Sequence, residues 1–174
     1  MTPKTKYLAI MLVAALLLVG CSEQIGDYIS ASSISKDGFA RDAEALRKMD
    51  GQEIKIWGFV DHSNMYGDED VKTILEDSWS GDGPNADTWR FNLKARADDE
   101  AGHSFSVQVP NDEGRDDLLR VFLADARAQR PTKVFLTGKI FTFEAPTNAA
   151  PLTGLYMEAQ SSRDVVVALP DDKR

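Results

Sequence analysis

Alternating apolar and polar residues predict five β-strands along this chain. From Glu53 to Val60 an aliphatic series alternates with a second series that carries Trp57 and Phe59. A period of two puts alternate side chains on opposite faces of a sheet. The same alternation predicts strands at 89–94, 105–109 and 133–143, and shorter apolar runs follow at 155–157 and 165–169. The expected fold class is therefore mainly β with helices.

An N-terminal helix is predicted over 36–50, where the apolar period lengthens to helical spacing. Ser35 is its expected N-cap and Gly51 its expected stop. Its apolar face comprises Phe39, Ala43, Leu46 and Met49.

A second helix is predicted over 115–129, after Asn111 or Asp112 as a cap and before Pro131. Its apolar stripe comprises Leu118, Leu119, Phe122, Leu123 and Ala126. We expect both helices to cover one aromatic set on the outer sides of the strands. That set comprises Trp57, Phe59, Phe135, Phe141 and Phe143. A stacking platform for nucleic acids or sugars is the alternative interpretation of the same residues.

Five strands with one helix between the third and fourth resemble the element order of an OB-fold, a small Greek-key barrel. The resemblance covers residues 52–169 and implies a five-stranded barrel that follows the N-terminal helix. Gly58 and Gly138 interrupt the first and fourth strands at mid-length, where glycine indicates a sharp bend. We expect these two strands to curl so that each serves both sheets of the barrel. A generic α+β sheet or a different small barrel is the alternative.

The first 21 residues carry an export signal. Lys4 and Lys6 precede an uncharged apolar run over 7–19, which is too short for a comfortable membrane span of ~20 residues. The run ends in Leu-Val-Gly-Cys, which resembles the lipobox of bacterial lipoprotein precursors. The resemblance implies cleavage between Gly20 and Cys21 and acylation of Cys21. An uncleaved hydrophobic anchor is the alternative.

The lipobox resemblance also implies a location and a division of the chain. Ser22 is not the aspartate linked to inner-membrane retention, so we expect an outer-membrane anchor on the periplasmic side rather than an inner-membrane one. The predicted segments are a signal peptide at 1–20, a lipidated Ser-rich tether at 21–35, the OB-fold-like domain at 36–169 and a charged tail at 170–174.

Charge and cysteine content exclude several classes of protein. A net charge of -8 opposes general binding to nucleic acid, because such binding depends on Lys and Arg neutralising phosphates. One cysteine excludes an internal disulfide and a thiolate-rich zinc site, and two histidines oppose a site built from imidazoles. We therefore expect neither a cofactor nor a bound metal.

The segment 61–87 is strongly acidic and also contains Trp79. Its spacing does not fit an EF-hand, since Trp79 and Gly81 occupy ligand positions. We interpret it as a solvated acidic loop over the barrel mouth. A metal-assisted hydrolase that uses this loop together with His62 is the alternative function. His62 and His103 otherwise stand apart in sequence, and no catalytic triad can be read from the chain.

The best candidate for a ligand face is the polar side of the second and third strands, because OB-folds usually bind partners there. Guanidinium, ammonium and amide groups on that side suit a carboxylate, a phosphate or hydroxyls. The candidate residues are Arg90, Asn92, Lys94, Ser106 and Gln108, with Trp79 from the acidic loop. An ordinary solvated sheet face is the alternative interpretation.

These observations predict a membrane-anchored, periplasm-facing binding or accessory module of the cell envelope, without catalysis of its own. Its expected partners are the bilayer, through Cys21, and an envelope protein or small ligand. Single-stranded nucleic-acid or oligosaccharide binding by the barrel face is a further alternative, although charge and location oppose nucleic acid. The stretches 88–94 and 114–119 also resemble an uncharacterised group of small proteobacterial proteins, which implies no activity.

Overall fold

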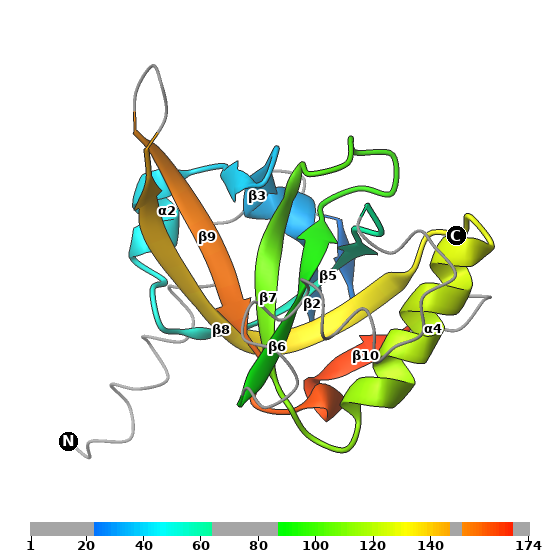
Figure 1. Cartoon of the computed structure of the whole chain (residues 1–174). Coiled ribbons are helices and arrows are strands. Elements are labelled where there is room, and N and C mark those ends of the chain that lie inside the picture. Colours follow the sequence, from blue (N-terminus) through cyan, green and yellow to red (C-terminus); the bar gives the residue numbers. More distant parts are fainter. Residues whose placement is uncertain (1–22, 64–86, 147–150, 169–174) are drawn as a thin grey trace, which may run out of the picture.

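The computed structural model describes residues 23–63, 87–146 and 151–168. Figure 1 shows a curved sheet with helices at its ends. The strands are β1 (Gln24–Ile25), β2 (Tyr28–Ser30), β3 (Ser35–Lys36), β4 (Phe39–Ala40), β5 (Glu53–Val60), β6 (Thr88–Lys94), β7 (Ser104–Pro110), β8 (Lys133–Ala145), β9 (Leu152–Glu158) and β10 (Val165–Val167). The helices are α2 (Ala43–Arg47) and α4 (Arg115–Arg127), with short 3-10 turns η1 (Ala31–Ser33) and η3 (Ser162–Asp164). None of the helices in this part of the chain is long and apolar enough to span a membrane.

Five of the strands close into a ring. The order around it is β5-β6-β7-β9-β8 and back to β5, with β7 and β9 parallel and every other neighbouring pair antiparallel. Helix α4 lies between β7 and β8 in the chain. The prediction of a mainly β chain whose ring resembles an OB-fold barrel is confirmed. The period of two located β5 at 53–60, as observed, and the other main strands to within a few residues.

The two mid-strand glycines lie where strands change partners. Strand β8 pairs with β5 up to Lys139 and with β9 from Lys139 onward. A Cβ on Gly138 would stand 2.6 Å from the carbonyl oxygen of Glu158, and one on Gly58 would stand 2.8 Å from that of Lys94. Only glycine allows these close backbone approaches. The predicted bends in the first and fourth strands are confirmed.

The core fills the ring, and α4 covers one of its ends. The largest side chains inside it include Trp89, Phe91 and Phe122, each exposed by no more than 1%. Phe122 of α4 packs edge-on against Phe91 at a centroid distance of 5.2 Å. Gly114 precedes α4 as its N-cap, and Asp112 accepts instead from the backbone of Gly114 and Ser162. The prediction of Asn111 or Asp112 as the cap is therefore wrong.

The predicted cover for the outer aromatic residues is also wrong, because α4 packs on the core. The aromatic set is divided between two outer surfaces of the ring. Trp57 packs edge-on against Phe59, and Phe135 packs against Tyr28 of β2. Phe141 stacks instead on Tyr156 of β9. Periodicity assigned these rings to outer positions, but it did not indicate which element lies over each one.

The predicted tether is folded from residue 23 onward. Strand β2 runs parallel to β5, and Ala31 and Ile34 are buried in the core. Burial of these apolar side chains favours a fixed structure over a flexible tether. The interpretation of 21–35 as a tether is wrong for these described residues.

The predicted helix over 36–50 is shorter than expected. Residues 35–40 form a hairpin whose turn, Asp37-Gly38, has φ angles of 53° and 83°. An Asp-Gly pair in this conformation is the usual two-residue hairpin turn. Asp42, rather than Ser35, caps α2 by accepting from the backbone of Ala45. Helix α2 ends at Arg47 with Lys48 as its C-cap, so Gly51, at φ 73° in the following turn, is not the stop that the sequence predicted.

Candidate ligand-binding face

Strands β6, β7, β9 and β8 are neighbours in that order (Figure 1). We call the surface formed by their outward side chains the ligand face. Its rows follow from the strand registers. One row joins Asn92, Ser106, Tyr156 and Phe141, and the next joins Arg90, Gln108, Glu158 and Lys139. The first row is polar at one end and aromatic at the other. The second row carries charges of both signs.

A hollow of about 300 Å³ lies on the ligand face beneath the tip of the β3–β4 hairpin. We call it the sheet pocket. Its polar lining includes Asp37, Asn92, Ser104 and Ser106, and its aromatic lining includes Phe39, Phe143 and Tyr156. The hairpin is held close to the sheet, since a Cβ on Gly38 would stand 2.6 Å from the carbonyl oxygen of Ser104.

The aromatic wall of the sheet pocket is open to solvent. Tyr156 and Phe141 stack at 5.1 Å with an interplanar angle of 18°. The ring of Phe143 lies over Gly154 and is 51% exposed. A large exposed aromatic side chain beside polar groups is typical of a binding site more than of a stability element.

The polar wall contains groups with capacity left for a ligand. Among the described residues, the buried hydroxyl oxygen of Ser106 has no hydrogen-bond partner. Burial, followed by the nearby charges of Glu158 and Asp50, raises the pKa of Tyr156, so its phenol stays protonated and can donate. The amide of Asn92 supplies both donor and acceptor capacity. The pocket thus combines an apolar platform with neutral hydrogen-bonding groups and the carboxylate of Asp37.

The structure brings together only part of the predicted ligand-face set. Asn92 and Ser106 line the sheet pocket, whereas Lys94 lines a different hollow beside His62. Arg90 and Gln108 lie in the neighbouring charged row. Trp79 lies outside the described residues, as do Gly20 and Cys21.

Most residues of the pocket lie outside the ligand-face set that the sequence predicted. Phe143 belonged to the outer aromatic set, which helices were expected to cover and for which a stacking platform was only the alternative, and Tyr156 was assigned to a strand but not to a site. Asp37 and Phe39 were assigned to a helix. The Asp37-Gly38 pair was the signal for the hairpin that carries both residues to the pocket.

Asp61 and His62 occupy structural positions at the end of β5. The Asp61 carboxylate accepts from the Ser104 hydroxyl at 2.7 Å, Gly102 N at 2.9 Å and Ser63 N at 3.1 Å. Burial alone would raise the pKa of Asp61, but these hydrogen bonds outweigh it and lower the pKa. These hydrogen bonds therefore connect the β6–β7 loop and the start of β7 to the end of β5.

His62 is linked to a buried network. Its Nε2 lies 3.0 Å from the hydroxyl of Thr132, which donates to Asp125 at 2.9 Å. Since that hydroxyl has one proton, it accepts from His62, which places the hydrogen of a neutral ring on Nε2.

Residues 23–63, 87–146 and 151–168 contain no group of three His, Cys, Asp or Glu that could hold a metal ion. Most of the acidic segment, 64–86, lies outside them.

Comparison with known proteins gives distant structural similarity only. No protein-family model matches the chain, and no curated protein matches it significantly. The OBody AM3L09 bound to hen egg-white lysozyme is 15% identical with a TM-score of 0.36, and the match covers 74% of this chain and 93% of that one. The OBody AM2EP06 bound to hen egg-white lysozyme is 20% identical with a TM-score of 0.35, covering 72% and 87%. These similarities assign the chain to no family.

Proposed function

We propose that this protein is a lipid-anchored, periplasm-facing module of the cell envelope that binds its ligand in the sheet pocket without catalysing a reaction. The observation that carries the proposal is the convergence of Asn92 and Ser106 with Tyr156 and Phe143 in one hollow. The anchor is Cys21, acylated after cleavage behind Gly20, as the lipobox resemblance implies. The outer membrane, on its periplasmic side, is the proposed location.

The chemistry of the sheet pocket supports a neutral, hydroxylated ligand with one apolar face, such as the sugar rings of an oligosaccharide. An aromatic platform contacts the apolar face of such a ring, while amide and hydroxyl groups bond its hydroxyls. The cations of the ligand face, Arg90, Lys94 and Lys139, lie outside the pocket lining. This arrangement favours a neutral ligand over a nucleic-acid strand, whose affinity depends on phosphate contacts.

The anchor is tested by expressing the full chain in bacteria and measuring its intact mass and its partition between membrane and soluble fractions. We expect loss of residues 1–20 and acyl chains on Cys21, while Cys21→Ser keeps the precursor mass. An unprocessed chain with a free thiol would contradict the anchoring.

Ligand binding is tested by saturation-transfer NMR on the full chain in detergent micelles. The probes are short oligosaccharides of N-acetylglucosamine and of glucose, with a thymidine oligonucleotide as the competing class. We expect saccharide signals that vanish in Tyr156→Ala and in the exposed-residue variant Phe143→Ala. Lys139→Ala, on the same face but outside the pocket, is the matched control and should keep them. Signals that survive in every variant, or that arise only from the oligonucleotide, contradict the proposal.

A further inference from the structure

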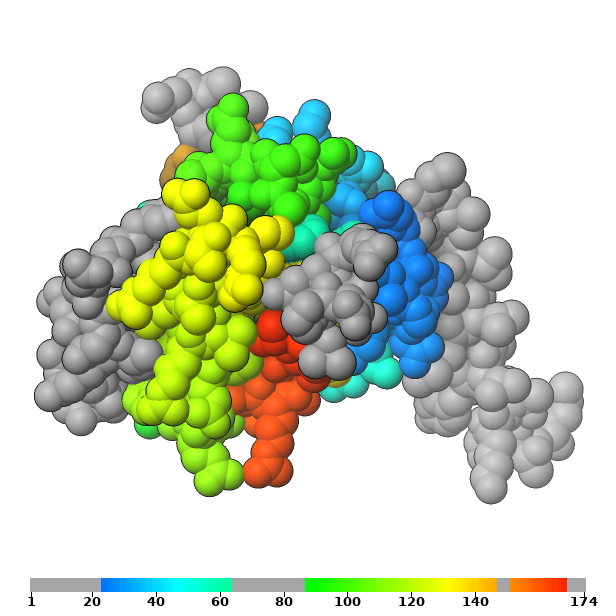
Figure 2. Space-filling model, turned by 90° about the vertical axis from the view of Figure 1, so that its right-hand side faces the viewer, coloured from blue at the N-terminus to red at the C-terminus, as the bar shows by residue number. Residues whose placement is uncertain are grey.

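A second outer surface of the molecule lies beside the point where the lipid anchor joins the fold. We call it the anchor face: the outward side of β1, β2, β5, β8 and β10, which are neighbours in that order. Figure 2 shows the N-terminal segment in blue and β10 in red on this side of the molecule. By register its outward residues include Ile25, Tyr28, Trp57, Phe135 and Val166.

The chain is fixed to this face two residues after Cys21. The carbonyl oxygen of Glu23 accepts from Ser30 N at 2.9 Å and from the indole nitrogen of Trp57 at 3.3 Å. Two residues span at most about 7 Å, so Cys21 lies within that reach of Glu23. An acyl-modified cysteine sits at the membrane surface, and no long tether separates it from the folded domain.

We propose that the anchor face lies against the lipid headgroups of the membrane that holds Cys21. This inference rests on the proposed acylation of Cys21. The short connection brings the residues around Glu23 to headgroup level. The partner of this surface is the bilayer that the anchor enters.

The side chains of the anchor face suit a membrane interface. Ile25 is 39% exposed and Val166 is 52% exposed, so this side presents two large aliphatic side chains to its surroundings. Between them, Tyr28 packs edge-on against Phe135 at 5.1 Å, and the ammonium of Lys55 lies 5.8 Å from the Tyr28 ring centroid. Aromatic rings with polar tips and long cationic side chains are enriched at the headgroup level of membranes.

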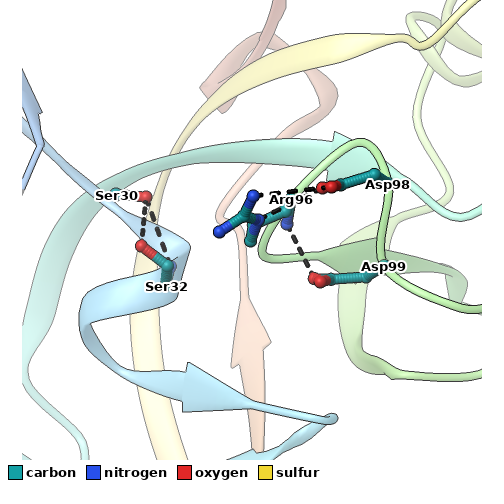
Figure 3. Close-up of polar contacts among 5 residues, drawn as sticks. All are labelled: Ser30, Ser32, Arg96, Asp98 and Asp99. Carbon is teal, nitrogen blue, oxygen red and sulfur yellow. Dashed lines mark hydrogen bonds and ion pairs between the residues drawn. The ribbon is translucent and has the colours of Figure 1, made fainter.

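A hollow of about 540 Å³ at the edge of the anchor face adds cations to it. Trp57 and Phe59 line this hollow together with Ser30, Ser32, Arg41 and Arg96. Figure 3 shows Arg96 extending toward Ser30 and Ser32 while it pairs with Asp98. Arg41 has no ion-pair partner among the described residues, and its guanidinium can pair with a lipid phosphate. Acidic groups accompany the other cations of this side, since Glu23 also lines the hollow and Asp27 pairs with Lys55 at 3.5 Å, so Arg41 is the cation that we assign to a lipid phosphate.

The experiment measures the depth of a fluorescent label on the full, acylated protein in phospholipid vesicles that contain a headgroup-linked nitroxide quencher. Acylation occupies the thiol of Cys21, the only cysteine in the chain, so an introduced cysteine is the single labelling site. Val166→Cys places the label on the anchor face. Leu152→Cys is the matched control, because Leu152 is a similarly exposed apolar residue, 43%, at the start of β9 on the far side. Ile25→Cys is a second anchor-face site in case the first variant folds poorly.

We expect at least threefold stronger quenching at Val166 and Ile25 than at Leu152. Equal quenching at these positions, or stronger quenching at Leu152, overturns the orientation while leaving the anchor intact. Intact mass of the same samples separates the two proposals. A chain with an unmodified Cys21 overturns the lipid anchor and the membrane contact together.

Discussion

Asp61 illustrates how one buried side chain holds two distant parts of the chain together. It is 2% exposed and accepts hydrogen bonds from Gly102 and Ser104 across the start of β7. Ser104 also lies in the sheet pocket, below the hairpin tip. The acidic segment that begins at Asp61 therefore contributes at least one carboxylate to the support of the ligand face.

Asp61→Asn should lower the free energy of unfolding at neutral pH by about 2 kcal/mol, because hydrogen bonds to a charged acceptor are replaced by weaker ones. Urea denaturation monitored by circular dichroism measures this change. Asp98→Asn is the control: its carboxylate is exposed and forms a surface ion pair with Arg96, so the midpoint should stay nearly unchanged.

Asp61→Asn also tests how the free energy of unfolding depends on pH. The pKa of Asp61 is lowered in the folded chain, so its contribution is present above the ordinary Asp pKa of about 4 and is lost as pH falls through the folded value. Asp61→Asn should therefore lose less stability than the native chain between neutral and strongly acidic pH. A parallel loss in both proteins would show that Asp61 does not contribute to acid sensitivity.

Secondary-structure elements depend on glycine where they bend and on aromatic packing where they meet. Strand β8 serves both β5 and β9 because Gly138 allows the backbone of Glu158 to approach. Helix α4 is attached to the ring through Phe122. Each of these contacts has a neighbouring residue that faces solvent and supplies a matched control.

Gly138→Ala should destabilise the protein by about 3 kcal/mol, since the new methyl group would overlap the Glu158 carbonyl and force the strands apart. Thermal and urea unfolding measure the loss. Lys139→Ala changes the next, exposed position and should stay within about 0.5 kcal/mol of the native chain. If the two variants unfold alike, the bend in β8 does not require glycine.

Phe122→Ala should cost about 3–5 kcal/mol, because it leaves a cavity between α4 and Phe91. Val121→Ala on the same helix is the comparison: Val121 is 40% exposed, so its truncation should cost less than about 1 kcal/mol. Chemical denaturation of both variants gives the difference. Similar values would mean that α4 is not packed on the core through Phe122.

The whole molecule extends beyond the five-stranded ring. Residues 23–40 add strands to two sides of it and contribute Ala31 and Ile34 to the core. The ring then presents two different outer surfaces, one beside the proposed anchor and one with the sheet pocket. This arrangement suits a module that is held close to a membrane while its ligand site faces another direction.

Removing residues 1–22 keeps every described contact, whereas removing residues 1–35 deletes β1, β2 and the burial of Ile34. The longer truncation should therefore lose about 3 kcal/mol or more of stability, mainly through lost apolar burial. Comparing the urea midpoints of the two truncated chains tests this. Equal urea midpoints would mean that residues 23–35 do not stabilise the fold and act only as a tether.

Local chemistry was sufficient to predict the five strands of the ring and the bends in two of them, but not the four short strands within residues 24–40. Alternation in β5, β7 and β8 and the glycines at 58 and 138 report which side chains face inward and where a strand must curl, and both are properties of neighbouring residues. The lipid anchor at Cys21 and the ligand-binding function, which the sequence also suggests, stay predictions. The alternation also placed Asn92 and Ser106 on one face, and their pairing across β6 and β7 brings both into the lining of the sheet pocket.

Long-range pairing decided the rest. The Asp37-Gly38 pair favours a hairpin at residues 35–40 locally, but its place against the sheet depends on Ser104 and Gly154, which belong to strands far away in the chain. Phe143 and Tyr156 line the sheet pocket, and none of the described residues that line it belongs to a helix. A period of hydrophobic residues defines a face, but the element that covers that face is chosen by the packing of the entire chain, and no local pattern contains that information.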